Sequence, residues 1–224
     1  MKFIVSSLIV LFSVIIVAQN PIEEDMGNFN TIKTFDLVKV NLVKSDVNKL
    51  VITGEDAQDV EFVLKNKTLK IRMKTERIFD GQNTFIHVYY KDLQTIDGNE
   101  GSVIVVNELM TQNNLEIKVQ EGARVEAGVA IENLDIRAVT GGIVSLTGAA
   151  KNQNIVVNTG GIVENAGLKT DDSRVKIQAG GEVEVYASNY VKIRINAGGD
   201  VMVYGNPNNI NKKTVFGGRI EIVE

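Results

Sequence analysis

A glycine recurs about every twenty residues through the second half of this chain, and each one separates two short runs of alternating apolar residues. The spacings between successive glycines are 21, 19, 19, 20, 18 and 19 residues. A repeat this short and regular indicates a solenoid, in which each repeat makes one turn of chain and stacks on the turn before it. The seven corner glycines are Gly101, Gly122, Gly141, Gly160, Gly180, Gly198 and Gly217.

Aliphatic residues keep fixed positions relative to these glycines. The residue three positions after each glycine is always β-branched and aliphatic, from Ile104 in the first repeat to Ile220 in the last. The residue five positions before it is aliphatic in every repeat except the last, which has Lys212. Side chains two apart on a strand share a face, and stiff β-branched residues suit a buried, pleated surface. We therefore predict that these columns point inward and form a continuous core.

The patterns predict an all-β, single-domain parallel β-solenoid, like a right-handed β-helix, with about 19–20 residues per turn. Neighbouring strands should lie ~4.8 Å apart, so seven turns should form a rod of roughly 30–35 Å. Glycine suits the corner, which needs a positive φ or a close approach of two backbones. A phosphate-binding loop is disfavoured because that loop opens a helix, and no helical periodicity follows these glycines.

The first part of the chain lacks this regularity. One lysine, a long apolar run and a small residue at its end are typical of a secretory signal peptide. A polar stretch follows, and then β-type alternation with irregular turns. We predict these segments: 1–18, signal peptide; 19–34, short leader; 35–224, solenoid domain, with irregular first turns or a cap at 35–92 and seven regular repeats at 93–224.

Charge and residue content argue against several classes of protein. The formal net charge is −4, which disfavours a dedicated nucleic-acid binder. The chain has no cysteine, so it has neither a disulfide framework nor a thiolate metal site. His87 is the only histidine, and no nucleophile-elbow motif accompanies it. We predict no enzymatic activity, no cofactor and no transmembrane segment after signal cleavage.

The repeat resembles a known family in the order and spacing of its motifs. The corners read NEGSV, QEGAR, TGGIV, TGGIV, AGGEV, AGGDV and FGGRI, and two further motifs are Thr147-Gly148-Ala149-Ala150 and Tyr204-Gly205-Asn206-Pro207. Over about residues 30–224 the chain is similar to the putative autotransporter adhesin, head GIN domain family of exported bacterial proteins. The resemblance implies a β-solenoid at the Gram-negative cell envelope, an adhesive role suggested by the family name, and no catalytic residues.

Two outward-facing features are candidate binding surfaces. A basic column four residues before the corner glycines runs beside an amide column, and we hypothesise that it binds an anionic glycan. The alternative is a solvated face whose charges keep sheets from stacking. Two tyrosines on adjacent turns could form a platform for a sugar, or could simply cover the sheet. The candidate residues are Lys118, Arg137, Lys176, Arg194, Tyr186 and Tyr204.

Acidic residues provide weaker candidates. Glu164 and Glu184 should be neighbours on adjacent turns, but one carboxylate pair supplies fewer oxygens than Ca²⁺ requires. The stretch Asp171–Arg174 is predicted to be a loop between turns. A solvated acidic face is the better interpretation of the glutamates.

The sequence therefore predicts a non-enzymatic, exported cell-envelope protein, structural or adhesin-like, that acts through a repetitive surface. The first alternative is a carbohydrate-binding module that recognises anionic glycan, and the second is a β-helix polysaccharide-active enzyme. The expected location is the periplasm, the outer membrane surface or the extracellular medium of a Gram-negative bacterium. Expected partners are an envelope glycan or protein, or a second copy in a homodimer through the open terminal edge of the solenoid.

Overall fold

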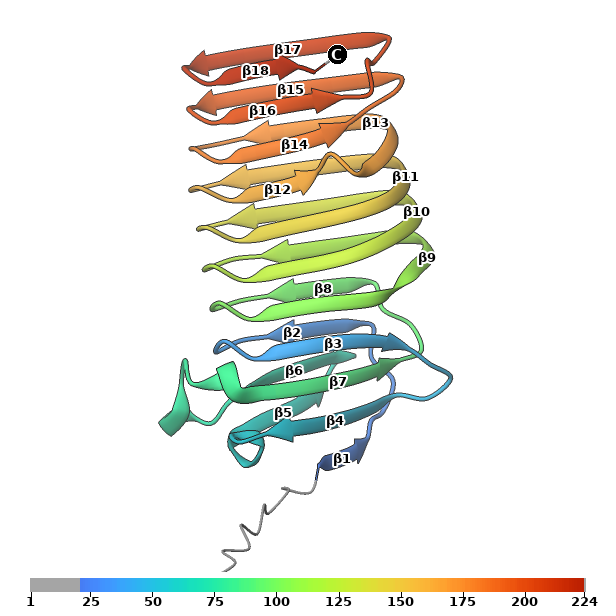
Figure 1. Ribbon diagram of the computed structural model, residues 1–224, viewed down its shortest axis with the longest axis vertical. Coiled ribbons are helices and arrows are strands. Elements are labelled where there is room, and N and C mark those ends of the chain that lie inside the picture. Colours follow the sequence, from blue (N-terminus) through green and yellow to red (C-terminus); the bar gives the residue numbers. More distant parts are fainter. Residues whose placement is uncertain (1–20, 224) are drawn as a thin grey trace, which may run out of the picture.

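The computed structural model describes residues 21–223, so the predicted signal peptide lies outside the described residues. These residues form an elongated all-β stack without an α-helix (Figure 1). The elements are β1 (Ile22–Asp25), β2 (Thr31–Thr34), β3 (Lys39–Lys44), β4 (Lys49–Gly54), η1 (Ala57–Asp59), β5 (Val60–Lys65), β6 (Thr68–Met73), η2 (Thr75–Arg77), η3 (Gly81–Asn83), β7 (Thr84–Tyr90), β8 (Thr95–Gly98), β9 (Val103–Val119), β10 (Arg124–Val139), β11 (Ile143–Asn158), β12 (Ile162–Asn165), β13 (Leu168–Ile177), β14 (Glu182–Tyr186), β15 (Tyr190–Ala197), β16 (Asp200–Tyr204), β17 (Asn209–Phe216) and β18 (Arg219–Ile222).

Each of the seven repeats forms one level of the solenoid, with one strand before the corner and one after it. Strands of successive levels pair in parallel, and equivalent residues lie opposite each other, as Ile117 does with Ile136. The long strands β9, β10 and β11 run from one level around a bend into the next. In Figure 1 the corners lie along one edge of the stack and the bends along the other. The predicted β-solenoid is confirmed.

The levels create two sheets, which we name by their relation to the corner. The entry sheet contains the strands before the corners: β2, β8, the second halves of β9 to β11, β13, β15 and β17. The exit sheet contains the strands after the corners: β3, the first halves of β9 to β11, β12, β14, β16 and β18. The aliphatic core fills the space between the two sheets.

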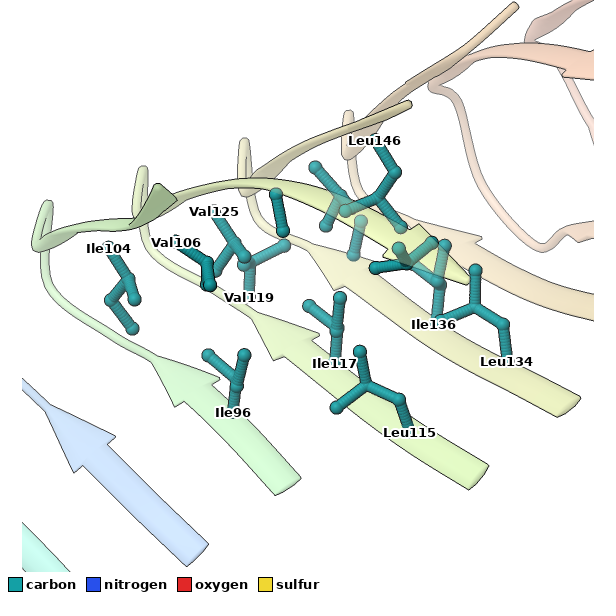
Figure 2. Close-up of a cluster of buried hydrophobic side chains, with 14 of the residues drawn as sticks. Ile96, Ile104, Val106, Leu115, Ile117, Val119, Val125, Leu134, Ile136 and Leu146 are labelled. Atoms are coloured by element: carbon teal, nitrogen blue, oxygen red, sulfur yellow. The ribbon is translucent and has the colours of Figure 1, made fainter. Parts of the chain in front are cut away.

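Figure 2 shows how the inward columns pack in this core. Ile96, Ile117 and Ile136 follow one another on the entry sheet, and Ile104 and Val125 on the exit sheet. These five side chains are between 0% and 3% exposed. Burial of each such side chain contributes about 1.5–3 kcal/mol to stability. The inward orientation predicted for the aliphatic columns is confirmed. At the last level, Lys212 takes the place of the aliphatic residue and is exposed.

The corner favours glycine because its backbone is left-handed. In each of the first four repeats the corner glycine and the residue before it both have positive φ, as Thr159 (50°) and Gly160 (73°) do. The N–H of Gly161 then donates to the carbonyl of Asn158 at 3.3 Å. Two positive φ angles closed by this hydrogen bond match a type I′ turn. From the fifth repeat on, the positive φ angles move to the glycine pair itself, as at Gly180 and Gly181.

The residue after the corner glycine is small for a different reason. A Cβ atom at Gly161 would lie 2.3 Å from the carbonyl oxygen of Ala138 on the preceding level, whereas a Cβ at Gly160 would meet no atom within 4 Å. Ala123 occupies this second position at the Gly122 corner, and a Cβ added to Gly98 on the preceding level would lie 3.3 Å from the Ala123 Cβ. The second glycine therefore allows close stacking of levels.

The structure adds a level that the glycine repeat did not reveal. Strand β2 pairs in parallel with β8, and β3 pairs in parallel with β9. Their corner contains Asp36 (φ 58°) and Leu37 (φ 64°) in place of glycine. The expectation of a polar leader over 19–34 is wrong for β1 and β2, because both strands pair with the sheet. The Thr34 hydroxyl lies 2.7 Å from that of Ser102 on the next level.

The levels of the N-terminal part do not follow chain order. Strands β6 and β7 pair in parallel with β2 and β3, so the β2–β3 level lies between β6–β7 and β8–β9. Strands β5, β4 and β1 then add antiparallel partners at the end of the stack. The less regular start expected from the sequence is confirmed, and its antiparallel strands cover the end of the core (Figure 1).

Two alanine substitutions at one corner separate the two reasons for glycine. We expect Gly160→Ala to cost about 1–2 kcal/mol, because only the left-handed backbone is penalised. Gly161→Ala should cost about 3 kcal/mol or more, because the new methyl meets a backbone carbonyl of the preceding level. Urea unfolding of both variants measures the difference. Equal losses would contradict the close-approach explanation.

The carboxyl groups of Asp36 and Glu100, close together at the Leu37 corner, predict that the stability of the protein depends on pH. Burial first, and then the hydrogen bond and charge of Asp36, raise the pKa of Glu100 above its ordinary value. The folded state therefore holds this proton more tightly than the unfolded state, and the protein loses stability as pH rises through that raised pKa. We expect Glu100→Gln to raise Tm at pH 7 by about 1–2 °C and to have little effect at pH 4.

The exposed Glu132→Gln provides the control for this measurement. It should leave Tm within error at both pH values. A Glu100→Gln variant that gained as much at pH 4 as at pH 7 would show that the raised pKa is not the cause.

Candidate functional site

The basic column predicted from the sequence lies on the outer surface of the entry sheet. Lys118 is opposite Arg137, and Lys176 is opposite Arg194, with Val156 between the two pairs. Lys118 also forms an ion pair with Glu116 at 2.8 Å, which partly neutralises it. The column is therefore aligned along the axis, but its charge is strongest on β13 and β15.

Two further cations make that end of the column a compact cluster. Arg174 and Lys192 lie opposite each other on β13 and β15, two positions before Lys176 and Arg194. Strand separation of ~4.8 Å and about 6.6–7 Å between alternate residues give a two-by-two arrangement. We call Arg174, Lys176, Lys192 and Arg194 the basic grid. All four are exposed and line a shallow depression of about 360 Å³.

No carboxylate in residues 21–223 lies within salt-bridge distance of the basic grid. Its one side-chain hydrogen bond within that range runs from Arg194 Nε to Asn196 Oδ1, at 2.9 Å. Elsewhere on the same sheet, Lys33 pairs with the buried Asp97 at 2.7 Å. The grid therefore concentrates four uncompensated positive charges, which attract an anionic partner.

Sequence reasoning missed two members of this grid. Arg174 was assigned to a predicted loop at 171–174, but those residues lie within the ten-residue strand β13. That loop prediction is wrong, because Ser173 is buried and Asp172 accepts a hydrogen bond from Asn189 on the next level at 2.7 Å. Arg174 and Lys192 lie two residues before Lys176 and Arg194 and therefore share their outer face, with the buried Val175 and Ile193 in between. This alternation was the signal that could have found them.

The structure places the tyrosine pair away from these cations. Tyr186 and Tyr204 are opposite each other on β14 and β16, at the bend end of the exit sheet. A Cβ at Gly205 would lie 2.7 Å from the Tyr186 ring, so this ring covers the glycine backbone. Both tyrosines are half-buried. The pair and the basic grid therefore belong to different surfaces and cannot contact one short ligand together.

The outer surface of the exit sheet has the opposite charge on the same levels. Glu164 is opposite Glu184, and Glu182 is opposite Asp200. We call these four residues the acidic grid, which lines a depression of about 200 Å³. Arg219 reaches Asp200 at 3.5 Å.

Arg124 compensates one end of the acidic grid. Its guanidinium pairs with Glu126 and reaches Glu164 at 3.3 Å. The hydrogen bond with Glu126, more than the opposing burial, raises the pKa of Arg124 above its ordinary value. Among residues 21–223, Glu182 and Glu184 have no basic group within salt-bridge distance. The centre of the acidic grid is therefore uncompensated.

Other candidate chemistry is sparse in the part of the chain that the structure describes. Within residues 21–223, no group of three or more His, Cys, Asp or Glu side chains is arranged to hold a metal ion. His87 is half-buried in β7, opposite Asn41 and Val51. No helix formed by these residues has the length and hydrophobicity needed to cross a bilayer.

The geometry defines a class of protein: an extended β-solenoid whose outer surfaces are repetitive and charged. The chain belongs to the family described as putative auto-transporter adhesin, head GIN domain, whose profile matches residues 28–207. The family resemblance inferred from the corner motifs is thereby confirmed. No curated protein matches the chain.

Solved structures from Bacteroides and Parabacteroides species share the fold. A putative adhesin from Bacteroides fragilis is 18% identical, with a TM-score of 0.83 over 91% of this chain and 96% of the other. A putative adhesin from Parabacteroides distasonis is 17% identical, with a TM-score of 0.76 and the same coverage. A putative lipid binding protein from P. distasonis is 18% identical, with a TM-score of 0.68 over 92% and 97% of the two chains. At these identities the likeness shows the fold alone.

Proposed function

We propose that this protein is a non-enzymatic, exported protein of the cell envelope that acts as an adhesin through the outer surfaces of its solenoid. The family and the fold support this role, and the pattern of the first 18 residues supports export. The observation that carries the proposal is the basic grid, a binding surface with four exposed cations and no internal counter-charge.

A second candidate function is recognition of an anionic glycan, and the same grid favours it. Guanidinium groups bind carboxylate and sulfate in bidentate geometry, and lysines add point charges. A linear polymer with regularly spaced anions would engage several cations at once, so weak single contacts would add up to useful avidity. The tyrosine pair, on the other sheet, would have to act separately.

A polysaccharide-active enzyme has less support. Cleavage of an anionic glycan needs acid or base groups beside the cations that hold the substrate. The carboxylates Glu164 and Glu184 lie on the exit sheet, separated from the basic grid by the core. We therefore propose binding without catalysis.

The terminal strand is a poor site for the homodimer suggested by the sequence. Strand β17 is exposed along its whole length, and Phe216 is 77% exposed. However, Lys212 and Lys213 on this strand would repel the same residues of a second copy. We therefore look for a partner surface on the sheet faces and not on this edge.

Retention on an anionic polysaccharide tests the proposed binding surface. We expect Arg174→Gln, Lys176→Gln, Lys192→Gln and Arg194→Gln, combined in one protein, to weaken retention on a uronate polymer by at least about tenfold at low salt. The matched control is Lys118→Gln with Arg137→Gln, which removes two cations from the same sheet outside the grid. Equal retention of wild type and grid variant, with unchanged unfolding curves, would refute binding through the grid.

A further inference from the structure

The basic grid and three of the four residues of the acidic grid occupy the same levels of the solenoid on opposite faces, and Glu164 lies one level earlier. Strands β13 and β14 are joined by one corner, and β15 and β16 by the next. The first strand of each pair carries the basic grid, and the second carries Glu182, Glu184 and Asp200 of the acidic grid. Buried aliphatic residues such as Val175 and Val183 separate them. The grids therefore point away from each other and cannot pair within one molecule.

The grids also match in spacing. Both are built on parallel strands of the same stack, so neighbouring charges are ~4.8 Å apart across strands and about 6.6–7 Å apart along a strand. Uncharged side chains lie beside each grid: Asn154 beside the cations, and Ile162 and Met202 beside the carboxylates. The acidic grid is staggered, because Glu164 lies on β12, Glu182 and Glu184 on β14, and Asp200 on β16. A second copy laid against the first can therefore set three cations of the two-by-two basic grid against three carboxylates at once.

We propose that the basic grid of one molecule binds the acidic grid of a second copy of this chain, so that solenoids associate side by side, entry sheet against exit sheet. This inference rests on the proposed adhesive function and names its partner. The contact joins two different surfaces, so each bound molecule keeps one grid free. Such heterologous contacts extend into rows when they do not close into a ring.

The charge distribution favours a second copy over an anionic polymer. A polymer accounts for the basic grid but leaves Glu182 and Glu184 unexplained. A second copy accounts for both grids with one contact. The formal net charge of −4 disfavours non-specific self-attraction, so the proposed attraction comes from the local complementarity of the two surfaces.

Two neutralised variants test the proposal. The basic-grid variant combines Arg174→Gln, Lys176→Gln, Lys192→Gln and Arg194→Gln, and the acidic-grid variant combines Glu164→Gln, Glu182→Gln, Glu184→Gln and Asp200→Asn. In sedimentation velocity at low salt, the wild type should form concentration-dependent oligomers that dissociate in high salt. Each variant alone should associate at least about tenfold more weakly. An equimolar mixture should form one-to-one dimers and no larger rows, because only one complementary contact remains.

The control removes two exposed acids outside the grids, Glu108→Gln with Glu132→Gln, and should associate like the wild type. Urea unfolding confirms that each variant is folded. A wild type that stays monomeric at low salt, or a mixture that forms no dimer, would overturn the proposal. Polysaccharide retention distinguishes a failure of self-association from a failure of glycan binding. The acidic-grid variant keeps all four cations, so it should still be retained on the polysaccharide even if the molecules do not self-associate. Loss of retention in the basic-grid variant alone supports glycan binding.

Discussion

The in-register parallel pairing of successive levels is the constraint on which the rest of the structure depends. Because strand pairing sets the same residue positions opposite each other at every level, any side chain type that recurs in the sequence becomes a column in space. Isoleucines and valines turned inward give a continuous core. The same pairing stacks charges outside the core, where Lys176 lies opposite Arg194 and Glu164 opposite Glu184.

The corners show how closely this pairing constrains the backbone. One glycine supplies a left-handed φ, and the next leaves room for a carbonyl of the neighbouring level. At the Gly122 corner Ala123 takes the second position, and a Cβ added to Gly98 on the preceding level would lie 3.3 Å from the Ala123 Cβ. At the β2–β3 level, Asp36 and Leu37 hold left-handed angles without glycine, while the Asp36 carboxylate accepts hydrogen bonds from the backbone N–H groups of Met73 and Phe79. Local hydrogen bonds can thus replace glycine at a corner.

Stacked like charges destabilise a solenoid unless a counter-charge is near. At the N-terminal levels of the entry sheet, Lys33 and Lys118 each have a carboxylate partner. On β13 and β15 the described structure offers none, and the opposite face at the same levels carries an excess of carboxylates. Adjacent cations without a nearby counter-charge attract anionic groups. This attraction is the physical basis of the proposed adhesion.

The regular spacing of glycines and aliphatic residues was sufficient to predict the solenoid, its core columns and the alignment of Lys176 with Arg194, because these depend on local periodicity. The level at Leu37 could not be found this way, because its corner lacks glycine. The antiparallel strands at the start could not be found either, because the strand order there departs from the chain order. Arg174 was missed because acidic neighbours made strand β13 look like a loop.

The sequence by itself determined which residues face inward and which outward. Only the tertiary structure decided that cations and carboxylates of the same levels lie back to back, because that depends on how two sheets enclose one core.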